Sequence, residues 1–258
     1  MDLGLSRKIA LITGGSKGIG LACAELLARE GCRVAITSRN KANLDAAAKR
    51  IKGCFAQAAD LTSPTQAAHM IDAVEGEIGP IDILVNSAGA AQRTPPDDLE
   101  PAGWRAAMDA KFFTYIHVID PLIKRMAARR NGIIVNVIGN GGKVASPTHI
   151  AGGAANAALM LATAGLASAY ASRGIRVVGI NPGLTNTDRV AEGLRADARL
   201  SGTSPEESLK RALARIPLGR MAEPQEIARV VCFLASSQAS YVSGVTITMD
   251  GVSTPLVV

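Results

Sequence analysis

A glycine-rich turn between an apolar run and an amphipathic segment constrains this chain more than any other feature. Residues 13–20 read Thr-Gly-Gly-Ser-Lys-Gly-Ile-Gly, follow the apolar run Ile9–Ile12, and open a helical periodicity that starts at Ile19. Glycines let the backbone bend sharply and come close to a ligand. The N–H groups of a helix N-terminus attract phosphate. Strand, turn and helix in this order predict a dinucleotide-binding turn, the alternative being a glycine-rich connection without a ligand.

Short apolar runs alternate with longer helical periods along the rest of the 258 residues. The predicted strands are 8–12, 33–38, 54–59, 81–85, 132–138, 176–180 and 245–250, and the predicted helices are 18–30, 41–52, 64–78, 98–130, 149–172 and 224–236. This alternation predicts right-handed βαβ units, and the apolar strands are typical of a sheet covered on both faces. We expect one α/β domain over residues 1–258, a Rossmann-type doubly wound parallel sheet of about seven strands in three layers.

Residues 184–222 break this alternation. They are rich in charged and turn residues, such as Thr187-Asp188-Arg189 and Pro217-Leu218-Gly219-Arg220. They also follow a predicted strand, and open α/β sheets bind ligands at the carboxyl ends of their strands. We expect a mobile substrate lid here, the alternative being a surface excursion without a role.

The composition excludes several classes of protein. The net charge is +6, but Lys and Arg are dispersed, and no aromatic residues interleave with the densest group at 124–130. We therefore expect no nucleic-acid partner. No run of eighteen apolar residues occurs, so we expect no membrane span. The first predicted strand begins too early to leave room for a signal peptide, which predicts a cytoplasmic protein.

The four cysteines show no metal-binding pattern. They form no CxxC pair, do not cluster with histidine, and are Cys23, Cys32, Cys54 and Cys232. Since they fall in predicted helices or at strand starts, we expect reduced core thiols and no metal site.

Further motifs follow the glycine turn in a recognisable order. They are Asp60-Leu61, Asn86-Ser87-Ala88-Gly89, Asn181-Pro182-Gly183, Pro217-Leu218-Gly219-Arg220 and Asp250-Gly251. Together with residues 13–20 they resemble the short-chain dehydrogenase/reductase family, from about residue 5 to 252. The resemblance implies an oxidoreductase with a bound nicotinamide dinucleotide.

The resemblance also implies which residues contact the cofactor. The phosphate turn would comprise Gly14, Ser16, Lys17, Gly18, Ile19 and Gly20. Asp60 and Leu61 would flank the adenine, and Asn86, Ala88 and Gly89 would pass along its ribose. The carboxamide would be held by Pro182, Gly183 and Thr185, and a ribose hydroxyl by Asn156.

The end of the second predicted strand distinguishes NAD from NADP. An NAD site places an acidic residue there to bind the ribose 2′-hydroxyl. This chain has Ile36-Thr37-Ser38-Arg39-Asn40 and no acid before Asp45. Arg39 can fork onto a 2′-phosphate, and Lys17 adds a second cation. Either residue alone is typical of a solvated surface, but the two together favour NADP(H).

Carbonyl-reducing members of the family use Asn, Ser, Tyr and Lys, with Tyr as the acid/base and Lys lowering its pKa. Local anchors place these four positions on Lys111, Gly139, Gly152 and Asn156. A shifted alignment does not restore the motif. The chain has no Tyr-x-x-x-Lys, and its only tyrosines are Tyr115, Tyr170 and Tyr241.

Two residues are candidate substitutes. Lys111 would bring a cation into the site from another wall, unless it turns to solvent or pairs with Asp109 or Asp120. His149 lies three residues before Gly152 and can act as an acid/base near neutral pH. The alternative is an exposed histidine at a helix start. The segments Gly139-Asn140-Gly141-Gly142 and Gly152-Gly153 leave a wide pocket whose backbone N–H groups can act as donors.

These features lead to three hypotheses. The first is an NADP(H)-dependent oxidoreductase for a small carbonyl, alcohol or enone, with a non-standard proton-transfer site. The second is an inactive NADP(H)-binding protein, and the third is a lyase or hydrolase in the enlarged pocket. Arg189, Arg195 and Arg199 hint at an anionic substrate, unless they form a solvated face. The family resemblance implies a homo-oligomer, a tetramer or a dimer. Alanine-rich faces in 98–130 and 149–172 permit the close helix packing that this needs, the alternative being ordinary packing against the sheet.

Overall fold

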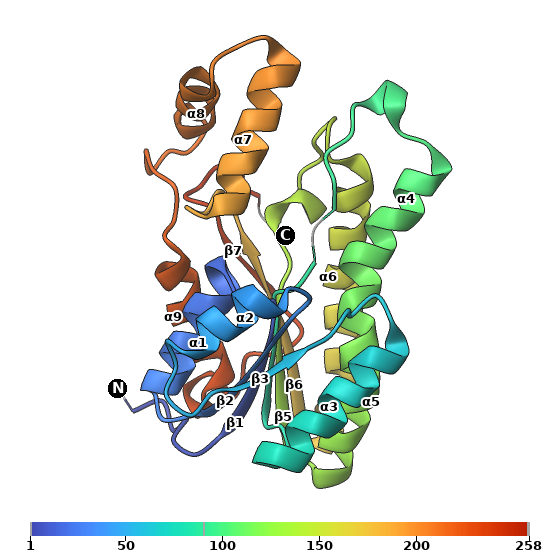
Figure 1. Cartoon of the computed structure of the whole chain (residues 1–258), viewed down its shortest axis with the longest axis vertical. Coiled ribbons are helices and arrows are strands. Elements are labelled where there is room, and N and C mark those ends of the chain that lie inside the picture. Colours follow the sequence, from blue (N-terminus) through green and yellow to red (C-terminus); the bar gives the residue numbers. More distant parts are fainter. Residues whose placement is uncertain (1, 90, 257–258) are drawn as a thin grey trace.

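The computed structural model describes residues 2–89 and 91–256. Seven parallel strands form one sheet in the order β3-β2-β1-β4-β5-β6-β7 (Figure 1). The strands are β1 Ile9–Thr13, β2 Arg33–Ser38, β3 Phe55–Ala58, β4 Ile83–Asn86, β5 Gly132–Val137, β6 Ile175–Pro182 and β7 Thr246–Met249. The doubly wound class is confirmed, and every predicted strand is present within one or two residues of its expected bounds.

Helices cover both faces of this sheet (Figure 1). One face carries α1 (Gly18–Arg29), α2 (Lys41–Ala48) and α9 (Pro224–Ala235), and the other carries α3 (Pro64–Ile78), α5 (Thr114–Arg129) and α6 (Ile150–Tyr170). The sheet therefore separates two apolar clusters, as expected when both faces of a parallel sheet are covered.

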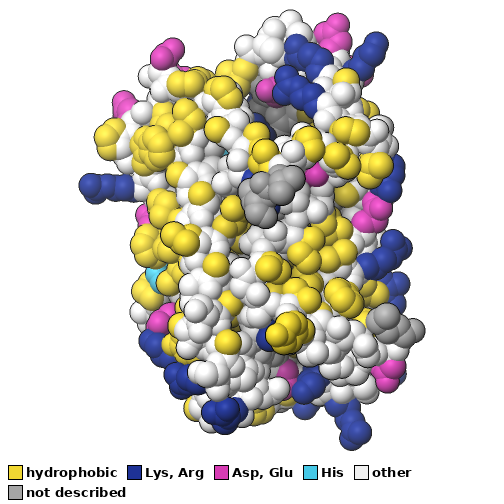
Figure 2. Space-filling model, turned by 180° about the vertical axis from the view of Figure 1, so that it is seen from behind, with side chains coloured by type: hydrophobic (Ala, Val, Ile, Leu, Met, Phe, Trp, Pro, Cys, Tyr) yellow, Lys and Arg dark blue, Asp and Glu magenta, His cyan; other side chains and the backbone are white. Residues whose placement is uncertain are grey.

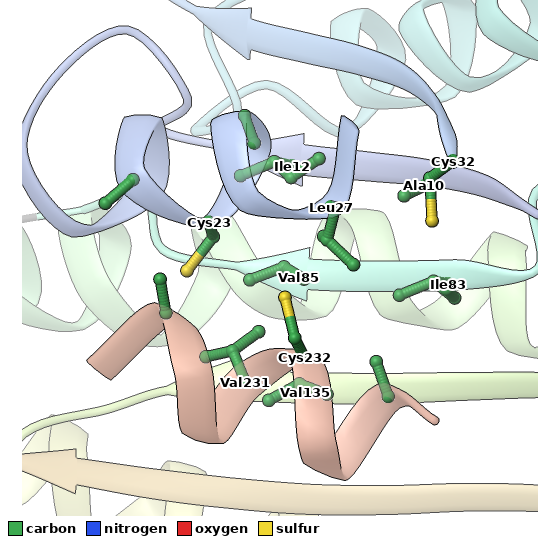
Figure 3. Close-up of a cluster of buried hydrophobic side chains, with 14 of the residues drawn as sticks. Ala10, Ile12, Cys23, Leu27, Cys32, Ile83, Val85, Val135, Val231 and Cys232 are labelled. Carbon is green, nitrogen blue, oxygen red and sulfur yellow. The ribbon is translucent and has the colours of Figure 1, made fainter. Parts of the chain in front are cut away.

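The cluster under α1 and α9 also holds most of the cysteines. Figure 3 shows Cys23 of α1 and Cys232 of α9 beside Leu27, Val231 and the central strands. The four cysteines are free, and Cys54 is half-buried while the others are buried. Burial raises the pKa of the Cys232 thiol to about 12, so it stays protonated and unreactive. These positions agree with the expectation of reduced core thiols.

The predicted helix 98–130 is wrong as a single element. A 3₁₀ turn at Pro96–Asp98 precedes α4 (Pro101–Ala107), and a π-helical segment, Met108–Phe113, joins α4 to α5. Pro101 begins α4 because proline fits the first helical turn. A π turn holds one extra residue per turn and redirects the side chains that it carries. In this chain it carries Lys111.

Residues 184–222 contain two helices that the sequence reading did not predict. These are α7 (Asp188–Ser201), which the Thr187 side chain caps, and α8 (Pro205–Ala214), which begins with a capping box between Ser204 and Glu207. Both helices project beyond the carboxyl ends of the strands (Figure 1). Their place agrees with a lid, and its mobility stays a prediction.

One helix in the described part of the chain, Ile150–Arg173, is long and apolar enough to cross a bilayer by length and composition. This segment is α6 with the turn after it, and it lies against the sheet. Its Thr163 accepts a hydrogen bond from Asn136 of β5 at 3.0 Å. Such packing is typical of the core helix of a Rossmann-type domain, and the absence of a membrane span stays a prediction.

Candidate dinucleotide and active site

The glycine turn lies where the strand order reverses between β1 and β4, the position at which doubly wound sheets bind ligands. Gly14 has a φ of +66°, and a β-carbon added to it would lie 2.8 Å from the carbonyl oxygen of Ser87. A β-carbon on Gly20 would collide with the Gly14 carbonyl. The turn therefore needs glycine at both positions in order to lie against the segment that follows β4.

The N-terminus of α1 differs from those of four other helices. Side chains cap α2, α3, α7 and α8, whereas no side chain caps α1. Lys17 occupies the N-cap position of α1 in an extended conformation and is exposed. The N–H groups of this first turn thus stay available to a phosphate, which the positive end of the helix also favours.

The adenine end of the predicted site lies after β2 and β3. Arg39 is exposed beyond the end of β2. Hydrogen bonds from the Thr62 N–H and hydroxyl lower the pKa of Asp60, and the positive charge of Arg39 contributes to the same shift. The Leu61 side chain is buried, and its carbonyl oxygen lies 2.9 Å from Nδ1 of His117. The structure thus places Arg39 near Asp60 and Leu61, at the end that would hold the adenosine.

Asn86 is fully buried, and its side chain is already occupied. Its Oδ1 accepts from the Thr13 hydroxyl at 3.3 Å, and its Nδ2 donates to Asn136 at 3.0 Å. The Thr13 oxygen in turn accepts from the N–H groups of Ser87 and Ala88. The Asn86 side chain therefore links β1, β4 and β5.

The segment after β6 closes the other side of the turn. A β-carbon on Gly18 would lie 3.2 Å from Cγ2 of Thr187, so this segment lies directly over the glycine turn. Thr185 is buried and donates to the Gly183 carbonyl at 3.2 Å. A β-carbon on Gly183 would lie 2.8 Å from Asp250, which explains the glycine after Pro182.

A buried acceptor provides a test of whether a nicotinamide dinucleotide fits. Asn156 is 5% exposed, and its Oδ1 has no hydrogen-bond partner among the described residues. A buried amide oxygen without a donor is destabilising. A ribose hydroxyl can supply that donor. With the uncapped helix and the close glycine turn, this fits the dinucleotide predicted from the sequence.

Lys111 lies inside the protein, not at its surface. The residue is 8% exposed, and its Nζ donates to the Tyr115 hydroxyl at 3.2 Å and to the Val137 carbonyl at 3.4 Å. The alternative of a solvated or carboxylate-paired lysine is wrong, since Lys111 is buried and no ion pair joins it to a carboxylate of the described residues; Asp120 pairs with Lys124 instead, at 2.7 Å. Burial, with a contribution from the charge of Arg189, lowers the pKa of Lys111 to about 7.

Tyr115 is a neighbour of this site that the sequence analysis did not assign. It is fully buried, and its hydroxyl donates to the Val137 carbonyl as well as accepting from Lys111. Burial raises its pKa, so it stays protonated. A Lys-x-x-x-Tyr spacing in residues 111–115 is the sequence signal for this pair, because residues four apart share a helix face. The order is the reverse of the family motif.

The imidazole of His149 occupies the space beside Gly152. A β-carbon on Gly152 would collide with this ring, lying 2.6 Å from Nε2 and 2.7 Å from Nδ1. His149 is the N-cap residue of α6 and has a φ of −134°, so it stands outside the regular helix. Its ring therefore fills the volume into which a side chain at residue 152 would extend.

Burial and nearby positive charges favour the neutral form of His149. Its Nδ1 is buried without a hydrogen-bond partner in the described part of the chain. Burial lowers the pKa of the ring, and the positive charges of Arg93, Arg189 and Lys111 lower it further. His149 is thus predominantly neutral at pH 7, and a nearby negative charge would raise its pKa.

Glycines bring the loop after β5 into contact with α6. Gly139 has a φ of +120°. A β-carbon on Gly142 would lie 2.8 Å from the Ala157 nitrogen, and one on Gly153 would lie 2.7 Å from the Gly141 carbonyl. Larger residues would push this loop away from the helix. The glycines thus let the loop and α6 pack together without side chains between them.

The three arginines of the predicted lid lie in two different places. Arg189 donates to the Gly89 carbonyl at 2.8 Å and connects α7 to the segment after β4. Arg195 and Arg199 are exposed farther along α7. Figure 2 shows a group of Lys and Arg side chains at the α7–α8 end, beside a hollow in this face. Of the predicted lid arginines, the structure thus brings only Arg189 into reach of the site.

No group of three or more His, Cys, Asp or Glu residues that could hold a metal ion occurs within residues 2–89 and 91–256.

The comparisons define the class of protein. A family model described as Enoyl-(Acyl carrier protein) reductase matches residues 14–252. This chain therefore belongs to the short-chain dehydrogenase/reductase family of oxidoreductases.

Individual relatives have varied activities. The chain is 33% identical over 251 residues to the 3-oxoacyl-[acyl-carrier-protein] reductase FabG of Thermotoga maritima, covering 96% of this chain and 98% of that one. It is 34% identical over 260 residues to the D-threitol dehydrogenase of Mycolicibacterium smegmatis, covering 97% and 94%. L-sorbose reductase from Gluconobacter frateurii, solved with NADPH and L-sorbose, superposes with a TM-score of 0.93 at 29% identity over the full length of both chains.

Proposed function

We propose that this protein is an NADP(H)-dependent oxidoreductase that interconverts a small carbonyl compound and its alcohol. In this proposal, proton transfer depends on His149 and Lys111 because the Asn-Ser-Tyr-Lys set is replaced at Lys111, Gly139, Gly152 and Asn156. The observation that carries the proposal is the imidazole of His149 beside Gly152, in the volume of the missing side chain.

Several residues support the preference for NADP(H). Arg39 after β2 and Lys17 at the start of α1 are exposed cations, and no acid ends β2. An arginine fork suits a 2′-phosphate better than a 2′-hydroxyl. Structural relatives solved with NADPH include L-sorbose reductase and an actinorhodin polyketide ketoreductase with a TM-score of 0.92 and 28% identity.

The catalytic roles follow from the same geometry. Bound NADPH supplies the hydride that the carbonyl carbon accepts. The carbonyl oxygen would take the electron pair of the double bond and then a proton from the imidazolium form of His149, which the developing negative charge on that oxygen favours. Lys111, whose pKa lies at about 7, would in its protonated form add positive charge from the side of β5 and stabilise the developing negative charge on that oxygen. Asn156 accepts from a ribose hydroxyl and positions the cofactor.

The proposal includes assembly with further copies of the chain. Leu161 of α6 is 76% exposed, and Trp104 of α4 and Phe113 are each 39% exposed. Large apolar side chains on neighbouring helices are typical of a surface that another subunit covers. Sedimentation analysis distinguishes a tetramer or dimer from a monomer, and Leu161→Glu should shift the distribution toward monomer.

The test of function is a turnover assay with NADPH and a panel of ketones, oxo acids, quinones and enones, followed by nicotinamide absorbance. We expect turnover of at least one class, with NADPH bound more tightly than NADH. Tight NADPH binding without turnover of any compound would instead indicate an inactive binding protein, and tighter NADH binding would contradict the cofactor assignment.

A further inference from the structure

We propose that Asp250 is a positioning residue of the active site: through Asn140 it holds the loop after β5 against the ring of His149. This inference rests on the proposed function and adds a residue to the site described there. Asp250 directly follows the end of β7, far from β5 in the sequence. It fixes the backbone beside the proton-transfer group and does not itself exchange a proton or a hydride with the substrate.

The loop after β5 needs an anchor outside itself. Three of the four residues 139–142 are glycine, and fixing a glycine backbone costs more conformational entropy than fixing that of any other residue. The N–H groups of Lys143 and Val144 donate to the Asn140 carbonyl at 3.0 and 3.2 Å, so these backbone hydrogen bonds stay within the loop. Asn140 carries the only side chain of residues 139–142 and is therefore the residue there whose side chain can tie the loop to another element.

The side chain of Asn140 is bound to the segment after β7. Its Nδ2 donates to Oδ2 of Asp250 at 2.9 Å and to the hydroxyl of Thr254 at 2.8 Å. The Thr254 hydroxyl donates in turn to the same Asp250 oxygen, so the three side chains form a closed set of hydrogen bonds. Oδ1 of Asn140 has no hydrogen-bond partner among the described residues. The side-chain anchor therefore depends on Asp250 and Thr254.

The turn that carries Asp250 is built around its carboxylate. Oδ1 accepts from the Val252 N–H at 3.0 Å, and Oδ2 accepts from the Ser253 hydroxyl at 3.1 Å. Burial alone would raise the pKa of Asp250, but these hydrogen bonds and that from Thr254 lower it overall, so the group is charged at pH 7. Val252 has a φ of +69°, which a β-branched residue keeps only where its surroundings hold it. Asn140 thus has a charged partner in a fixed turn, and charge-assisted hydrogen bonds are the stronger ones.

The anchored loop forms a wall beside the proton-transfer group. A β-carbon on Gly141 would lie 3.1 Å from Cδ2 and 3.6 Å from Nε2 of His149, so the backbone of Gly141 lies against the ring. Nδ1 of the ring makes no hydrogen bond in the described part of the chain, and its orientation therefore depends on packing. A loop that moved away from α6 would leave the ring without this support and displace the proton donor.

Asp250 also lies beside two other segments at the ligand end of the sheet. A β-carbon on Gly183, in the predicted carboxamide segment, would lie 2.8 Å from Asp250. The N–H of Leu218, in the predicted lid, donates to the Gly251 carbonyl at 3.3 Å. A loss of activity on removal of the Asp250 carboxylate would therefore not by itself identify the route through Asn140. A double variant does identify it, because two changes that break one connection are not additive.

The test measures kcat, the KM of the best carbonyl substrate and the Kd of NADPH. Asn140→Ala and Asp250→Ala should each lower kcat by about 10–100-fold, because a displaced proton donor slows the chemical step, and leave KM and Kd within about threefold. The double variant should be no slower than the slower single variant. Thr254→Val should also lower kcat, whereas Thr254→Ser keeps the hydroxyl and should retain it. Ser253→Ala removes a different hydrogen bond to Asp250 and is the matched control, with kcat unchanged.

An unchanged kcat in Asn140→Ala, losses that multiply in the double variant, or an equal loss in Ser253→Ala overturns the positioning role and leaves the proposed oxidoreductase function intact. If no compound is turned over although NADPH binds, the proposed function fails, and hydrogen exchange decides the anchor. The amides of residues 139–144 should then exchange at least about tenfold faster in Asn140→Ala, with those of residues 13–20 unchanged. Equal exchange contradicts the anchor. If Asp250→Ala does not fold, Thr254→Val, which keeps the carboxylate and the side-chain shape, takes its place in the double variant.

Discussion

The ends of β1 and β5 both carry clustered glycines, but the glycines serve different purposes. After β1, Gly14 and Gly20 bring the turn close to the segment after β4 and leave the N-terminus of α1 uncapped. After β5, Gly142 of the loop and Gly153 of α6 let the loop and the helix come into contact, and Gly152 leaves the space that the His149 ring occupies. The first arrangement leaves backbone donors for a ligand, and the second leaves room for the ring of His149. Cofactor binding and proton transfer thus depend on separate elements. A substitution in one of these elements can therefore alter one property and leave the other unaffected.

The largest effect should come from the β5 side. We expect His149→Gln to lower kcat by about 10²–10⁴-fold, because proton donation to the carbonyl oxygen is lost. The Kd for NADPH should stay unchanged, because His149 is not part of the phosphate turn. Steady-state kinetics and NADPH fluorescence titration measure the two effects separately. His69→Gln, at an exposed position on α3, is the control. Equal losses in NADPH affinity and kcat would mean that the two regions are not separate.

A complementary change on the β1 side should affect binding alone. Arg39→Glu removes the fork that would hold the 2′-phosphate and adds a like charge, so we expect NADPH to bind about 10–100-fold more weakly. NADH should bind within about threefold of its affinity for the unaltered protein. Arg33→Glu makes the same charge change at the opposite, exposed end of β2 and should affect neither cofactor. An equal loss for NADH and NADPH contradicts recognition of the 2′-phosphate.

Burial of Lys111 should make stability depend on pH. Its pKa is about 7 in the folded protein and 10.5 as an ordinary lysine, so the unfolded chain binds more protons between these values. The cost of burying the lysine is therefore complete below about pH 7 and disappears as the pH rises to about 10.5.

Lys111→Met removes that cost. Relative to the unaltered protein, the variant should be more stable at about pH 6 than at about pH 10, with the difference changing by up to ~1.4 kcal/mol per pH unit. Thermal unfolding across this range measures it, with Lys52→Met, an exposed lysine, as the control. If the difference in stability between Lys111→Met and the unaltered protein is the same at all pH values, burial does not lower the pKa of Lys111.

The smallest effects are expected for alanine substitutions at two glycines of α6, which should change the stability in opposite directions. Gly153→Ala brings a β-carbon within 2.7 Å of the Gly141 carbonyl, and we expect a loss of about 1–3 kcal/mol in the free energy of unfolding. Gly165→Ala meets nothing within 4 Å and should gain about 0.5–1 kcal/mol, because alanine is the better helix former. Chemical denaturation measures both. Similar values for the two variants would mean that the loop after β5 does not rest on α6.

The sequence predicts the sheet well because its strands are apolar runs with clear punctuation. It does not predict α7 and α8, whose surfaces are mostly charged, although Thr187 and the Ser204–Glu207 capping box mark their starts. The single helix predicted over 98–130 fails because a π-helical segment, Met108–Phe113, joins α4 to α5, and local apolar periodicity does not mark such a segment.

In the candidate site, the predicted segments meet as expected, but the side chains could not be placed from sequence. The burial of Lys111 depends on the π turn and on Tyr115, which lies four residues later. The position of the His149 ring depends on the absence of a side chain at Gly152. Local sequence patterns identify such residues as candidates, whereas their protonation depends on charges contributed by distant elements, such as Arg93 and Arg189.

Chemical rescue of His149→Gly tests the central claim most directly. This variant leaves a gap beside Gly152, and the rate of NADPH oxidation with the best substrate is measured as imidazole is added. We expect a slow variant whose rate rises with imidazole until it saturates, with NADPH affinity unchanged throughout. A variant as fast as the unaltered protein, or a slow one that imidazole does not accelerate, would contradict a proton-transfer site built around His149.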